Sequence, residues 1–549
     1  MKVVLIILSV YSAFLAFATE ALFSNIYTLT SSAGSAGCVL ASRLTENQDV
    51  SVLLIEAGGP ENLILSIPLV APIPEFNPDW NYDYRTEPYP DYCRGHVNKR
   101  CVWPVGKGTG GTSAVNLLIA HRGNMKDYDE WAKITGDDSW TPSTKNFVQA
   151  GAELGFPTPD DYNGPNQTGF HYLQYTMKNG ERWSVNRAYL HPAKDRRNLY
   201  ITRHSHVSKI LIDLKTKSAY GVQFEKNHKT VEVLARKEVI LSAGAIVSPK
   251  LLMLSGVGPA GYLSEFNIPT IQDSPGVGSN LLDHPLYEGI VFTIPQGSGI
   301  VTSRIINPLN PHIKNYLNNR NGQLSQPSHS GIAWVNVDNP NSQDDDPNME
   351  LIFSPTNIVM DNIVYKVLKI DQNYWKAFFG KLYERDAFQI LPVLIKPKST
   401  GRVLLKSQNS NDKLRLIVNY FQDPEEVHRL IKGIRLAIAV GKTRAMREAG
   451  AEFFNYPVPS CRDFKADSDE YWECAIRTLT LTNNHHSGSC CMGKTDDVNG
   501  IKNLRVVDAS VTPTSSSGHI HLTIIAIAEK ISDVIKEDWG MIRPNYYAL

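Results

Sequence analysis

The 549-residue sequence lacks an excess of charge of either sign, because Lys plus Arg and Asp plus Glu each total 55. This balance gives no support to nucleic acid or an anionic membrane surface as a partner. Beyond its N-terminus the chain also lacks an apolar run of the roughly 20 residues that a membrane-spanning helix needs. With 42% apolar and 20% charged residues, the composition is that of a globular protein. The length predicts two domains.

The N-terminus, MKVVLIILSVYSAFLAFATE, contains one Lys and an apolar run that ends in Ala16-Phe17-Ala18. Small residues on either side of a larger one are typical of a signal-peptidase site. A membrane anchor is the alternative, but the run is shorter than a bilayer span. Residues 1–18 are therefore expected to be the signal peptide of a secreted, extracellular protein, and Asn166 in the triplet NQT is expected to be glycosylated.

Cysteine is scarce, with seven residues, and four of them bracket two short loops. One pair is Cys93 and Cys101, and the other is Cys461 and Cys474. In an oxidising compartment each pair is expected to close its own loop by a disulfide, although the sequence alone does not fix the connectivity. The remaining cysteines, expected to be buried thiols, are Cys38, Cys490 and Cys491.

The stretch NIYTLTSSAGSAGCVLASRL, residues 25–44, has the spacing of a nucleotide-binding turn but lacks its first glycine, which is replaced by Ser32. Gly34, where the pyrophosphate approaches, and Gly37, where the helix packs on the strand, are both present. A helix-like run follows, and then an apolar strand that ends at Glu56. This order predicts a dinucleotide-binding βαβ unit in which Glu56 accepts hydrogen bonds from ribose hydroxyls.

Two features of this unit depart from the pattern. If Ser32 has a positive φ, its Cβ strains the turn by about 1 kcal/mol or more. The preceding strand, YTLTSS, is rich in hydroxyl groups, whereas a parallel strand buried on both faces is normally rich in Val and Ile. The alternative is an incidental Ser-rich linker behind a signal peptide.

Further stretches carry a resemblance to one family. Residues 103–131 (WPVGKGTGGTSAVNLLIAHRGNMKDYDEW) hold a second glycine cluster, which by itself is also compatible with a plain loop before a helix. This stretch and residues 238–259 (EVILSAGAIVSPKLLMLSGVGP) resemble the two signature stretches of the glucose–methanol–choline (GMC) family of FAD-dependent oxidoreductases. The second signature matches from Gly244 to Gly258, whereas the first departs at Thr109. Other stretches that resemble the family are PGVGSNLLDH (275–284), VLIKPKSTG (393–401), NYFQDPEE (419–426) and LRVVDASVTP (504–513).

The resemblance extends from the first strand almost to the C-terminus, and it is strongest to the secreted insect branch, which includes glucose dehydrogenases and leaf-beetle salicyl alcohol oxidases. It implies an α/β fold with a discontinuous, doubly wound, Rossmann-like FAD-binding domain and a mostly antiparallel substrate-binding domain. The FAD-binding pieces are expected near 22–134, 200–285 and 480–538. In family terms, the chain divides into an N-terminal region (22–290), a substrate-domain segment (291–391) and a C-terminal region (392–540).

Two histidines are implied to be catalytic. The stretch NNHHSGSCCMG resembles the family's His-x-x-Gly-(Thr/Ser)-Cys-x-Met-Gly and places one at His485. The stretch DASVTPTSSSGHIHLTIIAIAEK places the second at His519. A neutral imidazole, with an ordinary pKa of about 6.5, can take the hydroxyl proton of an alcohol near neutral pH, and a second one can orient the developing alkoxide. Neither can accept a hydride, so the FAD cofactor must do so.

A metal site is the alternative for this part of the chain, because it is rich in possible ligands. No CxxC or HxxxH spacing occurs, and two adjacent cysteines suit no common structural zinc pattern, so no metal is predicted. The possible ligands are His485, His486, Cys490, Cys491, His519 and His521.

The resemblance also assigns the remaining cofactor contacts. Gly110, Gly111 and Asn116 correspond to the loop along the flavin edge. Val207 corresponds to a backbone contact on the adenine side. The residues expected near the pyrophosphate and ribityl groups are Asp508 and Ala509.

Two segments depart from the family. Between Trp140 and Phe147, a block that normally forms a helix and a strand is expected to be absent, which would expose a sheet edge. Between Gly493 and Gly500 the link is short, which leaves His485 and His519 only 34 positions apart.

The sequence therefore supports two functional hypotheses. The first is a secreted FAD-dependent alcohol oxidase that converts a small primary alcohol, with aromatic salicyl-type alcohols among the candidates, to the aldehyde and reduces O2 to H2O2. Its partners would be the alcohol and O2, with no nucleic acid and no membrane. The second is an impaired GMC-fold paralogue that binds FAD poorly and has no redox role. An FAD dehydrogenase with another electron acceptor is a variant of the first hypothesis.

Overall fold

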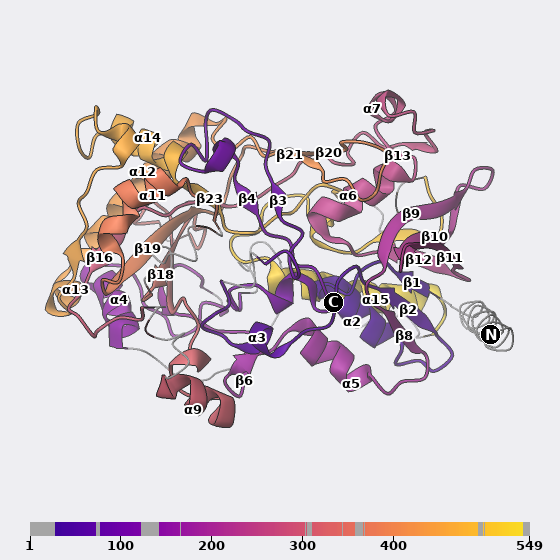
Figure 1. The fold of residues 1–549 in the computed structure, drawn as a ribbon, viewed down its shortest axis with the longest axis horizontal. Coiled ribbons are helices and arrows are strands. Elements are labelled where there is room, and N and C mark those ends of the chain that lie inside the picture. The colour runs from indigo at the N-terminus through magenta and orange to yellow at the C-terminus, as the bar shows by residue number, and fades with distance from the viewer. Residues whose placement is uncertain are drawn as a thin grey trace, which may run out of the picture.

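The protein consists of a mainly parallel α/β region next to a large antiparallel sheet (Figure 1). The expected signal peptide, most of the link between Gly493 and Gly500, and Trp140 lie outside the described residues. The computed structural model describes residues 28–72, 77–121, 142–164, 166–301, 304, 310–342, 344–356, 366, 368–491, 498 and 500–541.

A five-stranded parallel sheet forms the centre of the first region, in the order β24-β12-β1-β2-β8. Its strands come from three parts of the chain that lie far apart in the sequence, as the resemblance implied. The bounds are β1 (Thr28–Thr30), β2 (Val52–Ile55), β8 (Leu199–Thr202), β12 (Glu238–Leu241) and β24 (Leu504–Val506).

Helices cover both faces of this sheet, as expected for a doubly wound fold. Helices α2 (Ser35–Leu44) and α15 (His521–Asp538) pack against each other and share one apolar cluster with Val52, Leu54 and Ile240. The intervening residues, such as Leu53, face the opposite cluster, which contains α6 (Gly244–Leu254). Because side chains alternate along a strand, strands buried on both faces are apolar throughout.

Strand β1 is not apolar throughout, as its hydroxyl-rich sequence indicated. Thr28 and Thr30 are completely buried, yet the stretch forms the middle strand of the sheet and is followed directly by α2. Within the described residues neither threonine hydroxyl has a hydrogen-bond partner. A buried hydroxyl without a partner costs about 1–3 kcal/mol, so the tertiary pairing of β1 outweighs its unfavourable composition.

The second region is built on an eight-stranded antiparallel sheet, which confirms the predicted substrate-side architecture. Helices α12 (Pro424–Gly441) and α4 (Pro142–Glu153) pack against it. Its strands are β5 (Gly169–Tyr172), β15 (Pro285–Tyr287), β16 (Val291–Thr293), β17 (Gly331–Val335), β18 (Met349–Ser354), β19 (Ala387–Leu394), β22 (Glu452–Phe453) and β23 (Thr480–Thr482).

Smaller elements complete the fold. A three-stranded antiparallel sheet of β9 (His206–Asp213), β10 (Ser218–Lys226) and β11 (Lys229–Leu234) lies beside α6, to the right in Figure 1. Helix α14 (Asp469–Thr478) packs on α12. Among the described residues, no helix combines the length and the apolarity needed to cross a bilayer.

Both predicted disulfides are present, between Cys93 and Cys101 and between Cys461 and Cys474. The prediction for the other cysteines was only partly right. Cys38 is buried, but Cys490 is half-buried and Cys491 is exposed. The exposed thiol of Cys491 donates a hydrogen bond to the Gly488 carbonyl oxygen at 2.9 Å, a contact that the sequence did not indicate.

Candidate active site

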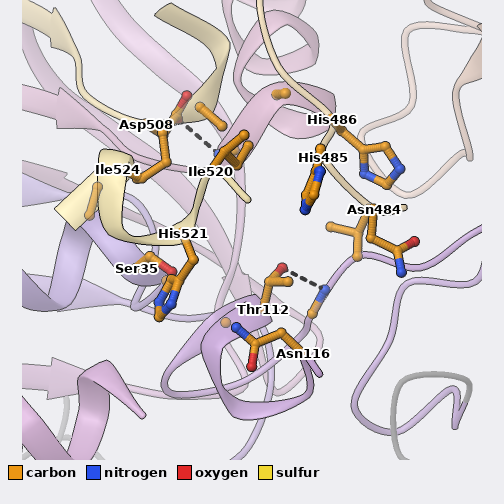
Figure 2. A pocket seen from close by; sticks show the side chains of 18 of the residues that line it. Ser35, Thr112, Asn116, Asn484, His485, His486, Asp508, Ile520, His521 and Ile524 are labelled. Atoms are coloured by element: carbon orange, nitrogen blue, oxygen red, sulfur yellow. Dashed lines mark hydrogen bonds between the residues drawn. The ribbon is translucent and has the colours of Figure 1, made fainter. Parts of the chain in front are cut away.

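A pocket lies between the parallel sheet and the edge of the antiparallel one (Figure 2). It encloses about 1170 Å³ that no protein atom fills, part of it open to solvent. Segments that line it include 32–36, 104–106, 111–112, 116–119, 242–246, 483–486, 508–509 and 519–521.

The turn after β1 forms one end of this pocket. Gly34 is the N-cap of α2, so the free N–H groups of the first helical turn point toward the pocket lining at Ser35 and Ala36. Such a helix start favours phosphate groups. Gly37 lies beneath the lining, where a Cβ would be 1.8 Å from the Ser32 carbonyl oxygen. The structure thus places Gly34 in the pocket lining and Gly37 at the helix–turn contact.

The expected strain at Ser32 is absent, because Ser32 does not have a positive φ. Its hydroxyl instead donates a hydrogen bond of 3.2 Å to the Glu56 carboxylate. That carboxylate also accepts the N–H groups of Ala33 (2.9 Å), Gly58 (2.8 Å) and Gly108 (2.9 Å). Glu56 is 2% exposed. A carboxylate offers about four acceptor positions, so in this structure Glu56 ties three loops together at the end of β2.

The second glycine cluster closes over the first turn. Gly110 and Gly111 have positive φ values of 100° and 53°, which favour glycine, and a Cβ on Gly111 would lie 2.6 Å from the Gly34 Cα. Asn116 lines the pocket and accepts a 2.7 Å hydrogen bond from the buried guanidinium of Arg182. The two glycine segments therefore meet at the pocket wall, as the resemblance implied.

Asp508 and Ala509 line the pocket near the start of α6. The Asp508 carboxylate accepts the N–H of Gly244 at 2.8 Å and the hydroxyl of Ser248 at 2.5 Å, so it anchors the first turn of that helix (Figure 2). Val207 lies on β9, is buried, and does not belong to the lining. Its predicted adenine-side role stays a prediction.

The opposite end of the pocket contains His485 and His519. Strands β15 and β23 pair antiparallel with Pro285 opposite Thr482, so the residues before β15 lie beside those after β23. Asp283 accepts the N–H of His485 at 2.9 Å and also bonds the hydroxyl of Tyr420. The loop that carries His485 is therefore fixed by backbone and side-chain bonds on both sides.

Five side chains form a continuous row of hydrogen bonds through this end. His284 Nδ1 lies 2.8 Å from His485 Nδ1, and His485 Nε2 lies 3.0 Å from His519 Nδ1. His519 Nε2 lies 2.7 Å from the Glu350 carboxylate. At the other end, His284 Nε2 bonds the hydroxyl of Ser515.

Burial and neighbouring charges determine that two imidazoles of the row are neutral. Burial, followed by the charge of His519, lowers the pKa of His485 well below its ordinary range and that of His284 to about 3. Both are therefore neutral at physiological pH. His519 lies against Glu350, which is completely buried, and a protonated His519 would pair with this carboxylate. This arrangement places a neutral base beside a second imidazole that can donate a hydrogen bond.

Three observations indicate that the pocket can accommodate a dinucleotide. The Gly34–Gly111 contact leaves no room for side chains in the wall, the start of α2 offers N–H groups, and both ring nitrogens of His521 are buried without a partner among the described residues. Figure 2 shows His521 close to Ser35 and opposite Asn116. No group of three or more possible ligands in the described residues is arranged to hold a metal ion.

Sequence reasoning missed several residues of this site. Asp283 and His284 stand in a stretch that was recognised for its glycines, and nothing in the spacing joined them to His485. Glu350 carried a usable signal, since it is the one charged residue in the apolar run of β18. Arg182 and His521 gave no signal in the sequence.

The parallel sheet, the glycine turn and the buried imidazoles are together those of a dinucleotide-dependent oxidoreductase. Comparison with protein families gives the particular group. The GMC oxidoreductase family matches with its N-terminal part at residues 26–144 and 140–286 and with its C-terminal part at residues 397–528. The chain belongs to the GMC oxidoreductase family.

Individual relatives span nearly the whole chain. Glucose dehydrogenase (FAD, quinone) of Drosophila melanogaster is 34% identical over 561 residues, which cover 92% of this chain and 86% of the relative. Alcohol dehydrogenase (acceptor) of Pseudomonas putida is 32% identical over 566 residues, which cover 92% and 94%. A formate oxidase structure from Aspergillus oryzae aligns with a TM-score of 0.80 and 23% identity over 94% of this chain and 98% of that one, which shows a shared fold.

Proposed function

We propose that this protein is a secreted FAD-dependent alcohol oxidase that converts a small primary alcohol to the aldehyde and reduces O2 to H2O2. The observation that carries the proposal is the 3.0 Å pair of His485 and His519 at the end of a pocket whose other end is a glycine-lined dinucleotide turn. FAD supplies the two-electron acceptor for the carbinol hydride, which no side chain of this site can take up.

The residues that would hold FAD follow from the lining. Gly34 and the start of α2 would bind the pyrophosphate, whereas Gly111 and Asn116 would lie along the flavin, with Gly110 behind Gly111 outside the lining. Asp508 and Ala509 would support the ribityl end through the start of α6. For Glu56 we propose the ribose side, where its carboxylate would exchange one of its bonds within the chain for a ribose hydroxyl.

In the proposed reaction, the alcohol oxygen replaces the direct 3.0 Å contact between His485 Nε2 and His519 Nδ1 and bonds both nitrogens. The O–H bond breaks as its proton moves to neutral His485, and the C–H bond breaks as the hydride leaves for FAD, so that the C=O bond forms. His519 donates its Nδ1–H to the developing alkoxide, and Glu350 accepts the Nε2–H of His519, which fixes the ring. Asp283 keeps the His485 backbone in place.

The electron acceptor has two candidates. O2 gives H2O2 and defines an oxidase. A quinone acceptor is the second candidate, favoured by the name of the Drosophila relative at 34% identity. Aromatic primary alcohols are candidate substrates through the resemblance to the salicyl alcohol oxidases.

Secretion is part of the proposal. It is supported by the signal-peptide pattern of residues 1–18 and by two formed disulfides, which persist in oxidising compartments. We also propose the division into an FAD-binding region (22–290), a substrate-domain segment (291–391) and a C-terminal region (392–540). The family matches fall within the first and the last of these regions.

The experiment starts with the colour of the purified protein before and after incubation with FAD. The flavin-loaded protein is then given benzyl-type and aliphatic primary alcohols, with peroxide and reduction of a quinone dye measured in parallel. Peroxide formation supports the oxidase, and dye reduction without peroxide supports the quinone-dependent form. A protein that stays colourless with FAD supports the impaired paralogue instead.

A further inference from the structure

The row of hydrogen bonds behind His485 leads out of the protein. His485 Nδ1 contacts His284 Nδ1 at 2.8 Å, and His284 Nε2 bonds the Ser515 hydroxyl. Both histidines are buried, whereas Ser515 is half-buried and its neighbour Thr514 is exposed. Two hydrogen bonds thus connect the proposed base with a segment at the surface.

We propose that His284 and Ser515 form the exit route for the alcohol proton that His485 accepts. This inference rests on the proposed function, because it assigns a path to the proton that alcohol oxidation releases. It makes His284 a residue that both positions His485 and relays its proton, without contact to the substrate.

The geometry of the route is fixed by the sheet. Because Pro285 pairs with Thr482, His284 lies opposite the segment that leads to His485, and its carbonyl oxygen accepts the N–H of Asn483 at 2.9 Å. The two imidazole rings stand at 89° with their centres 4.9 Å apart. A side chain held this firmly by backbone pairing keeps its nitrogen aligned for transfer.

The protonation pattern gives the route a direction. Each direct contact between two ring nitrogens needs one N–H and one lone pair. As the proposed base, neutral His485 has its lone pair on Nε2, so its proton lies on Nδ1 and is donated to His284. Neutral His284 then carries its proton on Nε2 and donates it to Ser515.

The transfer balances without any further reactant. The alcohol proton binds His485 Nε2 as the Nδ1 proton of His485 moves to His284 Nδ1, and the Nε2 proton of His284 moves to the Ser515 oxygen, whose own proton passes to solvent. One proton enters and one leaves, and no electron moves along the row. When O2 or a quinone is later reduced, it takes up protons, and the same row resets by transfer in the reverse direction.

The opposite end of the row offers no comparable exit. Glu350 lies on β18, in the middle of the antiparallel sheet, and its exposed fraction is 0%. It can hold the positive charge of His519 but it does not reach solvent. The half-buried Ser515 is therefore the end from which the proton leaves.

The test uses the flavin-loaded protein in a weakly buffered, oxygen-free solution with a pH-indicator dye. After mixing with a reactive alcohol, flavin bleaching and proton release are followed together. In the wild type we expect about one proton per flavin, released in step with bleaching. His284→Gln can still accept the Nδ1–H of His485 but cannot pass a proton on, so proton release should slow by about tenfold or more. Ser515→Ala should slow it less, because water can replace the hydroxyl.

Rescue separates a relay from a purely structural role. His284→Ala leaves a space beside the half-buried Ser515, and added imidazole should restore the proton release. His486→Ala is the matched control, because His486 is a buried neighbour that stacks on Trp103 at 4.0 Å and does not belong to the row. Imidazole should not rescue that variant. Equal flavin content in all variants shows that the fold is intact.

The possible failures are distinguishable. If alcohol bleaches the wild-type flavin but His284→Gln releases protons at the wild-type rate, the relay is wrong and the proposed function stands. If no alcohol bleaches the wild-type flavin, the proposed function is wrong and the relay falls with it.

Discussion

The two ends of the pocket differ in whether backbone or side chains form them. The dinucleotide end consists mainly of backbone: Gly34, Gly111 and the first turn of α2 shape it, and the Glu56 carboxylate binds three backbone N–H groups. The histidine end consists of side chains from segments up to 231 positions apart. A backbone site tolerates many substitutions at its margin, whereas a side-chain row fails when one member is lost.

Ser32 illustrates this tolerance. It stands where the dinucleotide pattern has glycine, yet its φ is not positive and its hydroxyl joins the hydrogen bonds of Glu56. The histidine end shows the reverse. His284, His485 and His519 each bond two neighbours in the row, so replacing any one of them removes two hydrogen bonds and leaves at least one buried partner without its bond.

The largest effect is expected from His485→Ala. The variant should lose about 10²–10⁴-fold in the rate of alcohol-driven flavin reduction, because the proton acceptor is gone. Flavin content should be retained, since the turn after β1 is untouched. Stopped-flow bleaching and the absorbance ratio of flavin to protein measure the two effects. Loss of flavin together with the rate would show that the two ends of the pocket are not separable.

At the dinucleotide end, a side chain at Gly37 should weaken FAD binding. In Gly37→Ala the new Cβ would meet the Ser32 carbonyl oxygen at 1.8 Å, so the turn must move. Such overpacking costs about 1–3 kcal/mol, or roughly 5- to 150-fold in FAD affinity if the strain falls on the bound form. Gly276→Ala is the control, because no atom lies within 4 Å of its added Cβ. Equal FAD affinity in both variants, measured by fluorescence titration, would contradict the role of Gly37.

His519→Asn should have an intermediate effect. The amide can still donate a hydrogen bond to the alkoxide but lacks the charge that Glu350 balances, so the rate should fall by about tenfold and less than in His485→Ala. The bleaching assay used for His485 measures it. A rate equal to that of His485→Ala would mean that His519 acts as the base.

Alcohol oxidation at the histidine end and FAD binding at the dinucleotide end should also differ in their pH dependence. Burial and the charge of His519 lower the pKa of His485. A lowered pKa keeps the base neutral to lower pH, so kcat/KM for the alcohol should fall only well below the ordinary histidine pKa of about 6.5. FAD affinity should stay constant across the same range. An acid limb at or above pH ~6.5 would show that His485 is not the base or is not shielded.

The smallest effect is expected for Ser32→Gly. Because the serine is unstrained, the glycine relieves nothing, and it loses the 3.2 Å bond to Glu56 while freeing an acceptor for the ribose. We expect the FAD dissociation constant to change by no more than about threefold, which is roughly 0.6 kcal/mol. A tenfold tighter complex would restore the idea that Ser32 strains the turn.

Much of the fold and part of the site could be predicted from the sequence. The order of glycine turn, helix, apolar strand and Glu56 predicted the βαβ unit, and family spacing predicted that His485 and His519 meet. The strain at Ser32 could only be stated as a condition, because the sequence of a turn does not determine the φ angle at each position. His284 and Glu350 were missed because their contacts join residues 201 and 169 positions apart, which only strand pairing brings together.

The central claim is that an alcohol reduces FAD held between the two ends of this pocket. The most direct test is the addition of primary alcohols to the flavin-loaded wild type without oxygen, while the absorbance of oxidised flavin is recorded. We predict complete bleaching with one aldehyde formed per flavin. A protein that binds FAD but keeps its oxidised spectrum with every alcohol tested would contradict the claim.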